Sequence, residues 1–582
     1  MKNPTDKEGI SLATFKTLFT AEGEEKNTKN WDQYPRPQLR RDSFLPLGGS
    51  WDFAVSRVKS IPEEFPLQIQ LPFPPESALS GLQRITQDGE YLYYKRTFKL
   101  PENFLKEKLL LHIGAADQIA HVWINGSLVC SHKGGYLPFT FDITHLLQEE
   151  NTLIIGTEDH LDDHILPYGK QRRDRGGMWY TPVSGIWQTV WLESVPEEYI
   201  SSLRIDVTQD SFSLAVSGAK MGIVTVKTET GDLTFPLEEG VCHGKLDHPH
   251  LWSPEDPYLY SFTIQTTEDR ISSYFALRTL EIKKVDGLMR LCLNGKPYFF
   301  HGLLDQGYWS DGLFTPASPE NYIRDIKEMK ALGFNMLRKH IKIESEIFYY
   351  ACDRLGMVVF QDFVNNGDYS FFWDTALPTI GIKRLNDRHL HKDPLTRAAF
   401  LKSMKETVDH LYNHPCIVYW TIFNEGWGQF DSSLAYEKLK EMDNTRFIDS
   451  ASGWFGGGKS DVQSEHVYFK KVKLKAGKKP LVLSEFGGYS HRVEDHVFNT
   501  ENAYGYGKCE TREDFVSAVC RLYEDEILPL VKKGLCAAVY TQVSDVEDEI
   551  NGLLTYDRRV QKLLPEEFLP ISQALTSAIR EK

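Results

Sequence analysis

The stretch IVYWTIFNEGWGQF, residues 417–430, decides how the rest of the chain is interpreted. It begins with a mostly apolar run rich in β-branched and aromatic side chains, which is typical of a buried strand in a parallel sheet. The run ends at Asn424 and Glu425, and glycines follow at once. Barrel enzymes place their catalytic groups at the carboxyl ends of such strands, so the pattern predicts that Glu425 is a catalytic carboxylate.

A second stretch, PLVLSEFGG at residues 480–488, repeats this pattern. Here a short apolar strand carries Glu485 into a glycine-rich loop. Two carboxylates on two strand ends of one barrel are the groups that an enzyme needs to break a glycosidic bond, because one protonates the departing oxygen while the other faces the anomeric carbon. We therefore predict that Glu425 and Glu485 act together on a glycoside.

The composition is that of an ordinary globular protein and limits the choice of partners. The 582 residues suggest about three or four domains. A formal net charge of −15 argues against nucleic acid and anionic membranes as partners. The first residues have no apolar signal region and no apolar run reaches about 18 residues, which predicts a cytoplasmic protein without membrane spans. The eight scattered cysteines predict reduced thiols rather than disulfides or a metal cluster.

Three regions with different hydrophobic periodicity follow one another along the chain. Residues 1–196 contain many short alternating segments and a hairpin signal at Asn125-Gly126, which predicts a β jelly-roll sandwich that either binds sugar or serves as a scaffold. Residues 197–281 contain roughly five to seven further short strands, which predicts an immunoglobulin-like β-sandwich. From 282 to 582 strands alternate with helices, which predicts a catalytic (β/α)8 TIM barrel.

Local signals place individual elements of the barrel. Ser318 and Pro319 predict the start of a helix that Gly333 ends. The alternation predicts eight strands, with Glu425 on the fourth and Glu485 on the seventh. The sixth strand is expected at HVYF, residues 466–469.

Other polar and aromatic residues near the expected strand ends complete a candidate substrate site. Asn424 is expected to bind a sugar hydroxyl through a hydrogen bond that strengthens as charge develops at the anomeric carbon. Arg338 is expected to keep Glu485 ionised, because a nearby cation lowers the pKa of a carboxylate; a structural salt bridge is the alternative. For the histidines and tryptophans, core packing is the alternative to substrate contact. The remaining candidates are Asp305, His340, Asp362, Trp427, Trp454, His466, Tyr468 and Gln542.

These motifs strongly resemble those of glycoside hydrolase family 2, the group that contains β-galactosidases, β-glucuronidases and β-mannosidases. The resemblance covers almost the whole chain and implies that Glu425 is the acid/base and Glu485 the nucleophile of a reaction that retains anomeric configuration, with no cofactor. The motifs that carry it are SGIWQTVW (184–191), NMLR (335–338), NHP (413–415), FNEG (423–426) and SEFG (484–487).

Positions at which the chain departs from the family's motifs help to choose between the possible sugar substrates. The chain has QDFVNN at 361–366, where large bacterial β-galactosidases carry a Glu and a His that help to bind magnesium, so no metal site is expected. It has Asn551-Gly552-Leu553 where the β-glucuronidase signature has an Asn followed two residues later by a Lys for the sugar carboxylate. The first three residues of the stretch 361–366, QDF, are similar to the corresponding residues of β-mannosidases. The first prediction is therefore a β-galactosidase-like exo-hydrolase that acts on a terminal sugar of an oligosaccharide or glycoside.

Several alternatives stay open at this point. The same residues fit β-mannosidase, β-glucosidase or uronidase specificity, and an open cleft would fit an endo-acting glycanase. A non-catalytic carbohydrate-binding protein on the same fold is the alternative from a different functional class. The sequence also permits a homo-oligomer.

Overall fold

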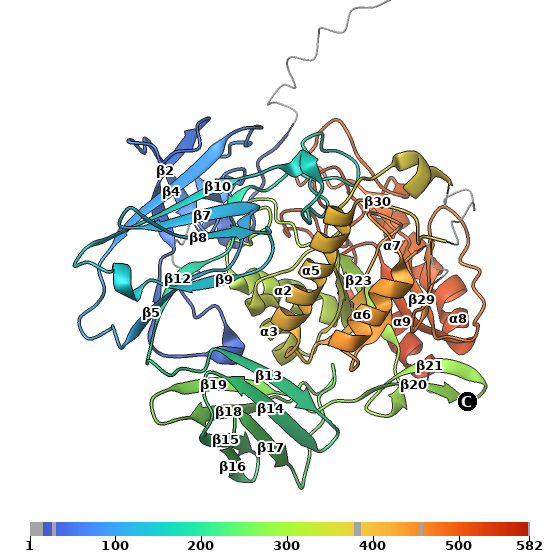
Figure 1. Cartoon of the computed structure of the whole chain (residues 1–582). Coiled ribbons are helices and arrows are strands. Elements are labelled where there is room, and N and C mark those ends of the chain that lie inside the picture. Colours follow the sequence, from blue (N-terminus) through green and yellow to red (C-terminus); the bar gives the residue numbers. More distant parts are fainter. Residues whose placement is uncertain (1–14, 26–30, 378–385, 454, 456–457, 580–582) are drawn as a thin grey trace, which may run out of the picture.

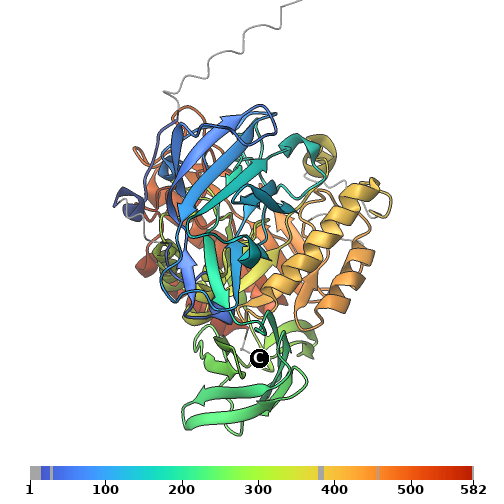
Figure 2. The same cartoon turned by 60° about the vertical axis from the view of Figure 1, so that its left-hand side comes forward.

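The predicted fold class is confirmed: two β-sandwiches precede a barrel of parallel strands (Figure 1). The computed structural model describes residues 15–25, 31–377, 386–453, 455 and 458–579. The jelly roll lies at the upper left of Figure 1, the immunoglobulin-like domain lies below it, and the barrel lies to the right of both. Figure 2, turned from this view, shows that the immunoglobulin-like domain projects from one end of the molecule.

The jelly roll consists of two facing antiparallel sheets, in the orders β1-β12-β5-β9 and β3-β2-β4-β10-β7-β8, with the short pair β11-β6 beside them. The predicted hairpin at Asn125-Gly126 joins β7 to β8, and both residues have the positive φ that this two-residue turn requires. The strands are β1 (Phe44–Pro46), β2 (Gly49–Ser56), β3 (Leu67–Leu71), β4 (Tyr91–Phe98), β5 (Lys108–Ile113), β6 (Ala116–Asp117), β7 (Ile119–Ile124), β8 (Ser127–Lys133), β9 (Phe139–Asp142), β10 (Asn151–Glu158), β11 (Gly185–Ile186) and β12 (Val190–Val195).

Short helical turns accompany these strands. They are α1 (Ala21–Glu24), η1 (Pro37–Leu39), η2 (Ala78–Ser80), η3 (Thr144–Leu146) and η4 (Leu161–Asp163).

The immunoglobulin-like domain packs two antiparallel sheets, β13-β14-β17 and β16-β15-β18-β19. Alternate residues of β14, namely Phe212, Leu214 and Val216, are buried between the sheets, as the period of a strand requires. Arg278, which follows the domain, donates to the backbone oxygens of Pro415 and Ile417 and so ties it to the barrel. The strands are β13 (Ser202–Val207), β14 (Ser211–Ser217), β15 (Gly222–Thr228), β16 (Gly231–Leu237), β17 (Val241–Lys245), β18 (Tyr260–Gln265) and β19 (Arg270–Phe275).

The barrel is a sheet of eight parallel strands in the order β27-β26-β25-β24-β23-β32-β29-β28. Helices between most of the successive strands cover its outside, whereas no helix of the described residues separates β27, β28 and β29 (Figure 1). Its strands are β23 (Phe300–Asp305), β24 (Met336–Lys339), β25 (Val358–Asp362), β26 (Ile417–Thr421), β27 (Phe447–Asp449), β28 (Gln463–Val467), β29 (Leu481–Phe486) and β32 (Leu535–Tyr540). Its helices are α2 (Pro319–Ala331), α3 (Glu346–Leu355), α5 (Pro394–Leu411), α6 (Ser432–Met442), α7 (Arg512–Leu522), α8 (Leu528–Lys532) and α9 (Pro565–Ala578), with π-helical turns η5 (Phe371–Ala376) and η6 (Tyr523–Ile527).

Smaller strands complete the chain. The hairpin β20 (Leu280–Val285) and β21 (Leu288–Leu293), with β22 (Lys296–Pro297), leads into the barrel, and Arg290 of β21 donates to the backbone oxygens of Val531 and Leu535. The pair β30 (Tyr489–His491) and β31 (Gly507–Cys509) follows β29.

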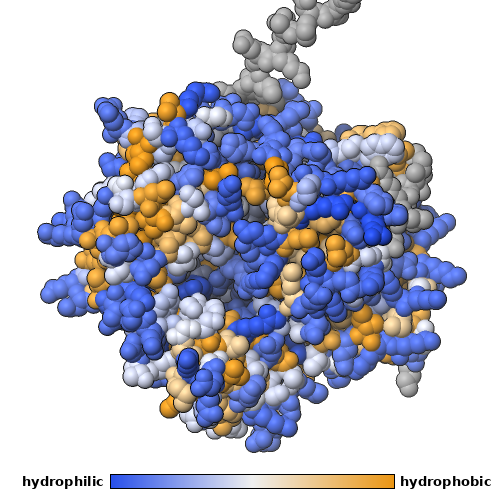
Figure 3. Space-filling view, in the orientation of Figure 1, coloured by the Kyte–Doolittle hydropathy of each residue, from blue (hydrophilic) through white to orange (hydrophobic). Residues whose placement is uncertain are grey.

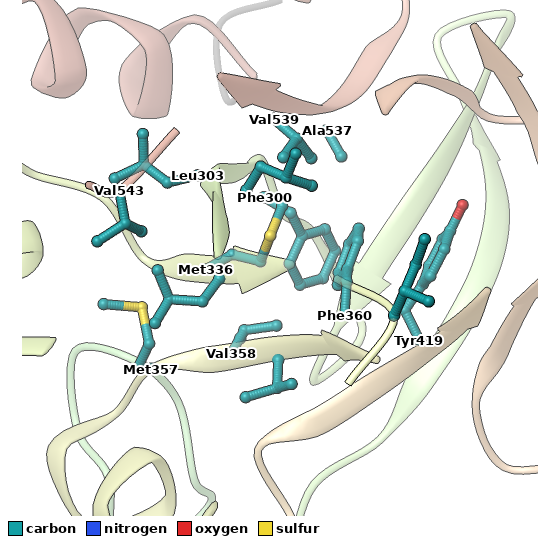
Figure 4. Packing of buried hydrophobic residues seen from close by; sticks show 14 of the residues in the cluster. Phe300, Leu303, Met336, Met357, Val358, Phe360, Tyr419, Ala537, Val539 and Val543 are labelled. Atoms are coloured by element: carbon teal, nitrogen blue, oxygen red, sulfur yellow. The ribbon is translucent and has the colours of Figure 1, made fainter. Parts of the chain in front are cut away.

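The core explains why the barrel strands are apolar along their whole length. Every residue of β25, β26, β29 and β32 is buried, because helices cover one face and the barrel interior fills the other. Phe360 of β25 stacks on Tyr419 of β26 with ring centroids 4.1 Å apart, and Phe300 of β23 packs beside them (Figure 4). This packing fixes the strand ends from which the site is built.

The predicted start of the first barrel helix is confirmed, whereas the predicted bounds of the sixth barrel strand are wrong. Ser318 caps α2 by accepting a hydrogen bond from the backbone N–H of Glu320, and Pro319 is its first residue. The sixth strand was placed too late: β28 is Gln463–Val467, and Phe469 has a φ of 59° that no strand accommodates. Apolar periodicity missed the start of β28 because Gln463, Ser464 and Glu465 are polar.

The outer surface carries no broad apolar face in the view of Figure 3, where hydrophobic residues form separate patches among hydrophilic ones. Within the described part of the chain, no helix combines the length and apolar character needed to cross a membrane.

Candidate active site

Glu425 lies just beyond the end of β26, in a backbone conformation that holds its side chain over the barrel mouth. Its φ is 52°, in the left-handed region that a non-glycine residue adopts at a cost, and such strain is typical of functional sites. The N–H of Glu425 donates to the backbone oxygen of Ser452. Gly428 completes the turn, because a Cβ there would lie 2.0 Å from the backbone oxygen of Asn366. Both glycines of the NEGWG motif have a positive φ, and a Cβ on Gly426 would lie 2.4 Å from the ring of Phe455.

Glu485 lies on β29, and both of its carboxylate oxygens are engaged. The guanidinium of Arg338, from β24, donates to Oε1 at 2.9 Å, and the hydroxyl of Tyr468 donates to Oε2 at 2.7 Å. Glu485 is 5% exposed and Arg338 is 1% exposed, so solvent screens this ion pair only weakly.

His466, at the end of β28, lies between the two glutamates. Its Nδ1 is 2.8 Å from Oε1 of Glu425, and its Nε2 is 3.6 Å from Oε1 of Glu485. One oxygen of each carboxylate and a nitrogen of the imidazole all lie within 4.8 Å of one another. The two predicted carboxylates therefore meet over one small space.

The charges around Glu485 favour its ionised form. Burial alone raises the pKa of this carboxyl, but the nearby His466 and Arg338, together with the hydrogen bond from Tyr468, lower the pKa to about 2. Glu485 is consequently a carboxylate near neutral pH.

Arg338 connects Glu485 to the other polar residues that the sequence singled out. Its Nε donates to Asp362 at 3.0 Å, and its Nη2 donates to the side-chain oxygen of Asn424 at 2.9 Å. Nδ1 of His340 lies 2.8 Å from the second oxygen of Asp362. Burial, followed by the charge of Lys170, lowers the pKa of His340 to about 4, so this imidazole is neutral near pH 7. Nδ1 then carries the proton that Asp362 accepts, and Nε2 is an acceptor.

Two buried N–H groups of the NEGWG turn have no partner within the described chain. They are the side-chain amide of Asn424 and the indole N–H of Trp427. Buried donors without a partner are costly, and at a pocket they are positioned to bind oxygen atoms of a ligand.

Comparison with known families decides what kind of site this is. The domain described as "Glycosyl hydrolases family 2, sugar binding domain" matches residues 50–196, "Glycosyl hydrolases family 2" matches 201–278, and "Glycosyl hydrolases family 2, TIM barrel domain" matches 282–492. The chain belongs to glycoside hydrolase family 2. It is therefore an O-glycosyl hydrolase, as the resemblance of the motifs predicted.

Three relatives illustrate how far the similarity to family 2 proteins extends. The chain is 27% identical over 483 residues to β-glucuronidase of Homo sapiens, covering 72% of this chain and 70% of that protein. Its fold is similar to that of β-D-glucuronidase from Dictyoglomus thermophilum, with a TM-score of 0.69, 18% identity, and coverage of 94% of this chain and 99% of that one. It is also similar to a family 2 β-galacturonidase from Eisenbergiella tayi bound to galacturonate, with a TM-score of 0.67, 18% identity and coverage of 94% and 99%.

Not every predicted site residue of this family 2 hydrolase joins the central cluster. Asp305 accepts from Lys339 at 2.6 Å, in a buried network that continues to Glu344. The side-chain amide of Gln542 donates to Asn551 and accepts from Gln306. Trp454 lies outside the described residues. The central cluster thus consists of Glu425, Glu485, Asn424, Arg338, His340, Asp362, His466, Tyr468 and Trp427.

The structure adds residues that the sequence reasoning missed, and they come from the jelly roll. Tyr180 donates to Glu549, in the loop after β32, and Arg175 pairs with Glu547 and Asp548 of the same loop. Lys170 lies over the ring of Trp427, with its ammonium 5.5 Å from the ring centroid. The sequence feature that could have pointed to these residues is the long stretch without strand periodicity between β10 and β11, because long irregular loops often carry function.

The three groups around His466 have the number and spacing of ligands that a metal ion needs. Each of them already has protein partners: Arg338 and Tyr468 bond to Glu485, while His466 lies against Glu425 and the Ser452 hydroxyl. These contacts offset the buried charge without an ion. The absence of a metal from the reaction stays a prediction.

Replacing Arg338 with glutamine is expected to shift the acid limb of the pH profile of kcat/KM to higher pH and to lower the plateau by about 10²- to 10³-fold. A glutamate predicted to act as nucleophile must be ionised, and without the arginine one of the causes that hold the pKa of Glu485 at about 2 is lost, so the carboxylate is protonated at a higher pH. The measurement is kcat/KM against pH, with activity re-measured at neutral pH to exclude acid unfolding.

Arg338→Lys is the matched control, because it keeps the positive charge but loses the planar fork that reaches Asp362 and Asn424. We expect a lowered plateau with an acid limb near that of the unmodified enzyme. An unshifted limb in Arg338→Gln would mean that Arg338 does not set the ionisation of Glu485.

Proposed function

We propose that this family 2 hydrolase is a retaining exo-β-glycosidase in which Glu485 is the nucleophile and Glu425 the acid/base. The observation that carries the proposal is the spacing of the two carboxylates, of which one oxygen each lies within 4.8 Å of the other and of His466. Retaining glycosidases separate their carboxyl groups by about 5 to 5.5 Å, whereas inverting enzymes leave about 6.5 to 9.5 Å for a water molecule.

The environments of the two glutamates support the assignment of their roles. Glu485 is held as an anion by Arg338 and Tyr468, which suits attack on an anomeric carbon. Glu425 contacts His466 and forms no ion pair with an arginine or lysine of the described chain. Two carboxyl groups with such different surroundings are typical of an acid and base pair.

The proposed reaction has two steps. An oxygen of Glu485 forms a bond to the anomeric carbon while the glycosidic bond breaks, and Glu425 transfers its proton to the departing oxygen. Glu425, now a carboxylate, takes a proton from water, whose oxygen attacks the anomeric carbon and releases Glu485. Each displacement inverts the carbon, so the released sugar keeps the β-configuration. The unpartnered amide of Asn424 is available for a sugar hydroxyl during both steps.

The walls around the site support action at the end of a sugar chain rather than within it. Jelly-roll residues Arg175, Tyr180 and Thr181 bond to the loop after β32, at residues 547–549. On another side, the backbone N–H of Tyr168 donates to the oxygen of Asn365, just after β25. Contacts from the jelly roll on two sides of the site favour binding of a terminal sugar, whereas an endo-acting glycanase needs an open cleft.

We further propose that the terminal sugar is a uronic acid. The similar proteins named above are glucuronidases and a galacturonidase, which favours the uronidase alternative over our first prediction of a β-galactosidase. The pocket also holds Lys170, a cation to which a sugar carboxylate can bind. A non-catalytic carbohydrate-binding protein is disfavoured, because it would have no need to maintain both carboxylates with their partners.

A panel of chromogenic β-glycosides tests the function. It pairs glucuronide with glucoside and galacturonide with galactoside, and includes mannoside and glucosaminide. We expect turnover of a uronide, and proton NMR is expected to detect the β-anomer of the free sugar before mutarotation. The α-anomer as first product would refute the retaining mechanism, and sugar binding by calorimetry without turnover of any glycoside would favour the non-catalytic alternative.

The cellular location is proposed from the thiols. All eight cysteines are free, five of them are buried, and no disulfide forms. A chain with eight free thiols is suited to a reducing compartment, so we propose that the protein works in the cytoplasm.

A further inference from the structure

Lys170 is a buried cation that the proposed mechanism does not use. It belongs to the jelly roll but is only 8% exposed, because it extends against the barrel. Its ammonium lies 5.5 Å from the ring centroid of Trp427 and 5.5 Å from that of Tyr180. Trp427 follows the catalytic Asn424-Glu425 pair by two residues, so Lys170 is placed at the sugar-binding part of the site.

The charge of the same ammonium also acts on two polar groups of the site, His340 and Glu549. Its charge is the second cause, after burial, of the low pKa of His340. Burial raises the pKa of Glu549, and Lys170 is the first of the charges that oppose this rise. The Lys170 charge therefore acts on His340, which pairs with Asp362, and on Glu549 in the loop after β32.

The backbone on both sides of Lys170 is fixed, so the ammonium has a defined position. Gly169 has a φ of 70°, and a Cβ there would lie 2.8 Å from the Tyr136 hydroxyl and 3.1 Å from the backbone oxygen of Ile341. The side chain of Gln171 donates to Asp117 at 2.8 Å and accepts from the N–H of Val183. A residue held in this way reaches the barrel without ordering a loop when substrate binds.

No carboxylate of the described chain lies within ion-pair distance of this ammonium. Lys170 forms no salt bridge there, and its ring contacts with Trp427 and Tyr180 are the interactions that its side chain makes. The buried indole N–H of Trp427 also has no partner. A cation that is largely surrounded by protein and has no counter-charge is available to pair with a bound anion.

We propose that Lys170 binds the carboxylate of a uronic acid at the non-reducing end of the substrate and so determines specificity for the acid over the neutral sugar. The inference rests on the proposed glycosidase function and assigns the recognition of its substrate. Leu553 occupies the position at which the glucuronidase signature has its lysine, so a cation for the sugar carboxylate has to come from another position. In this chain the cation comes from the jelly roll instead of the barrel.

The competing explanation is that Lys170 only offsets the charge of Glu549. Oε2 of Glu549 already accepts from the Tyr180 hydroxyl and faces the Gln542 amide at 3.5 Å. Glu549 and Lys170 form no ion pair, so no oxygen of Glu549 lies within 4.0 Å of the Lys170 ammonium. A purely compensating lysine would affect neutral and acidic sugars alike, which an experiment can distinguish.

The experiment measures kcat/KM for an aryl β-uronide, its methyl ester and the neutral aryl glycoside, with the unmodified enzyme and Lys170→Met. We expect the variant to lose about 10- to 150-fold on the free uronide and to change less than about threefold on the other two substrates, because only the free acid presents a charge to the ammonium. Lys170→Arg is expected to restore most of the loss. Lys402→Met, at an exposed lysine of α5, is the control for removing a surface cation.

The methyl ester also tests the inference without any mutation, in case Lys170→Met does not fold. The unmodified enzyme is expected to prefer the free uronide over its ester by a similar factor. An equal loss on acidic and neutral substrates in Lys170→Met, or no preference for the free acid in the unmodified enzyme, would overturn the assignment of Lys170. Turnover of neutral glycosides alone would overturn it while leaving the glycosidase function intact, and no turnover of any glycoside would overturn both.

Discussion

Replacing Glu485 with glutamine is expected to reduce kcat by at least about 10⁴-fold on every substrate that the enzyme hydrolyses. Glutamine has nearly the same shape and can still accept a hydrogen bond from Arg338, but its amide oxygen does not form the covalent intermediate. Because Glu485 is required in both displacement steps, a better leaving group will not rescue the variant. The measurement is kcat on the uronide and on an activated dinitrophenyl glycoside.

Covalent labelling provides a direct check of the same assignment. A 2-deoxy-2-fluoro glycoside of the preferred sugar is expected to inactivate the unmodified enzyme, and mass spectrometry of peptides is expected to find the label on Glu485. Glu494→Gln is the matched control, because this glutamate follows on the same segment but its side chain is 79% exposed. A label on another carboxylate, or full activity in Glu485→Gln, would refute the nucleophile.

The fold and the meeting of Glu425 with Glu485 were accessible from the sequence because both depend on local patterns. The strands that carry Glu425 and Glu485 are apolar throughout, since they are buried on both faces of the barrel. Parallel strands of one barrel end at the same rim, so identifying the two strands was enough to bring the two glutamates together. Arg338 was accessible for the same reason, because it lies at the end of β24.

The residues that surround the sugar were less accessible, because their positions depend on contacts between domains. Lys170 and Tyr180 lie in a jelly-roll loop without periodicity, and their places over Trp427 and Glu549 result from the docking of that loop on the barrel. The bridging position of His466 depends on the turn after β26, where Glu425 adopts a positive φ. Asp305 was predicted after the first barrel strand but is the last residue of β23, and its carboxylate accepts from Lys339 rather than joining the central cluster.

Replacing Glu425 with alanine is expected to produce a loss whose size depends on the leaving group, which separates acid catalysis from a structural role. On a glycoside with a poor leaving group we expect kcat/KM to fall by about 10²- to 10⁴-fold, because the departing oxygen receives no proton. On a dinitrophenyl glycoside, which departs without a proton, we expect kcat/KM to fall by less than about tenfold. The second step then limits turnover, because no base activates water.

Azide is expected to accelerate that second step in Glu425→Ala, since this small anion needs no base and fits the space left by the carboxylate. The product is expected to be a β-glycosyl azide, because attack on the Glu485 adduct inverts the carbon a second time. Glu425→Gln is the matched control: it also lacks a proton donor but keeps the side chain's volume, so azide is expected to rescue it less. An equal loss on good and poor leaving groups, with no azide adduct, would show that Glu425 supports the NEGWG turn and that the proton comes from another group.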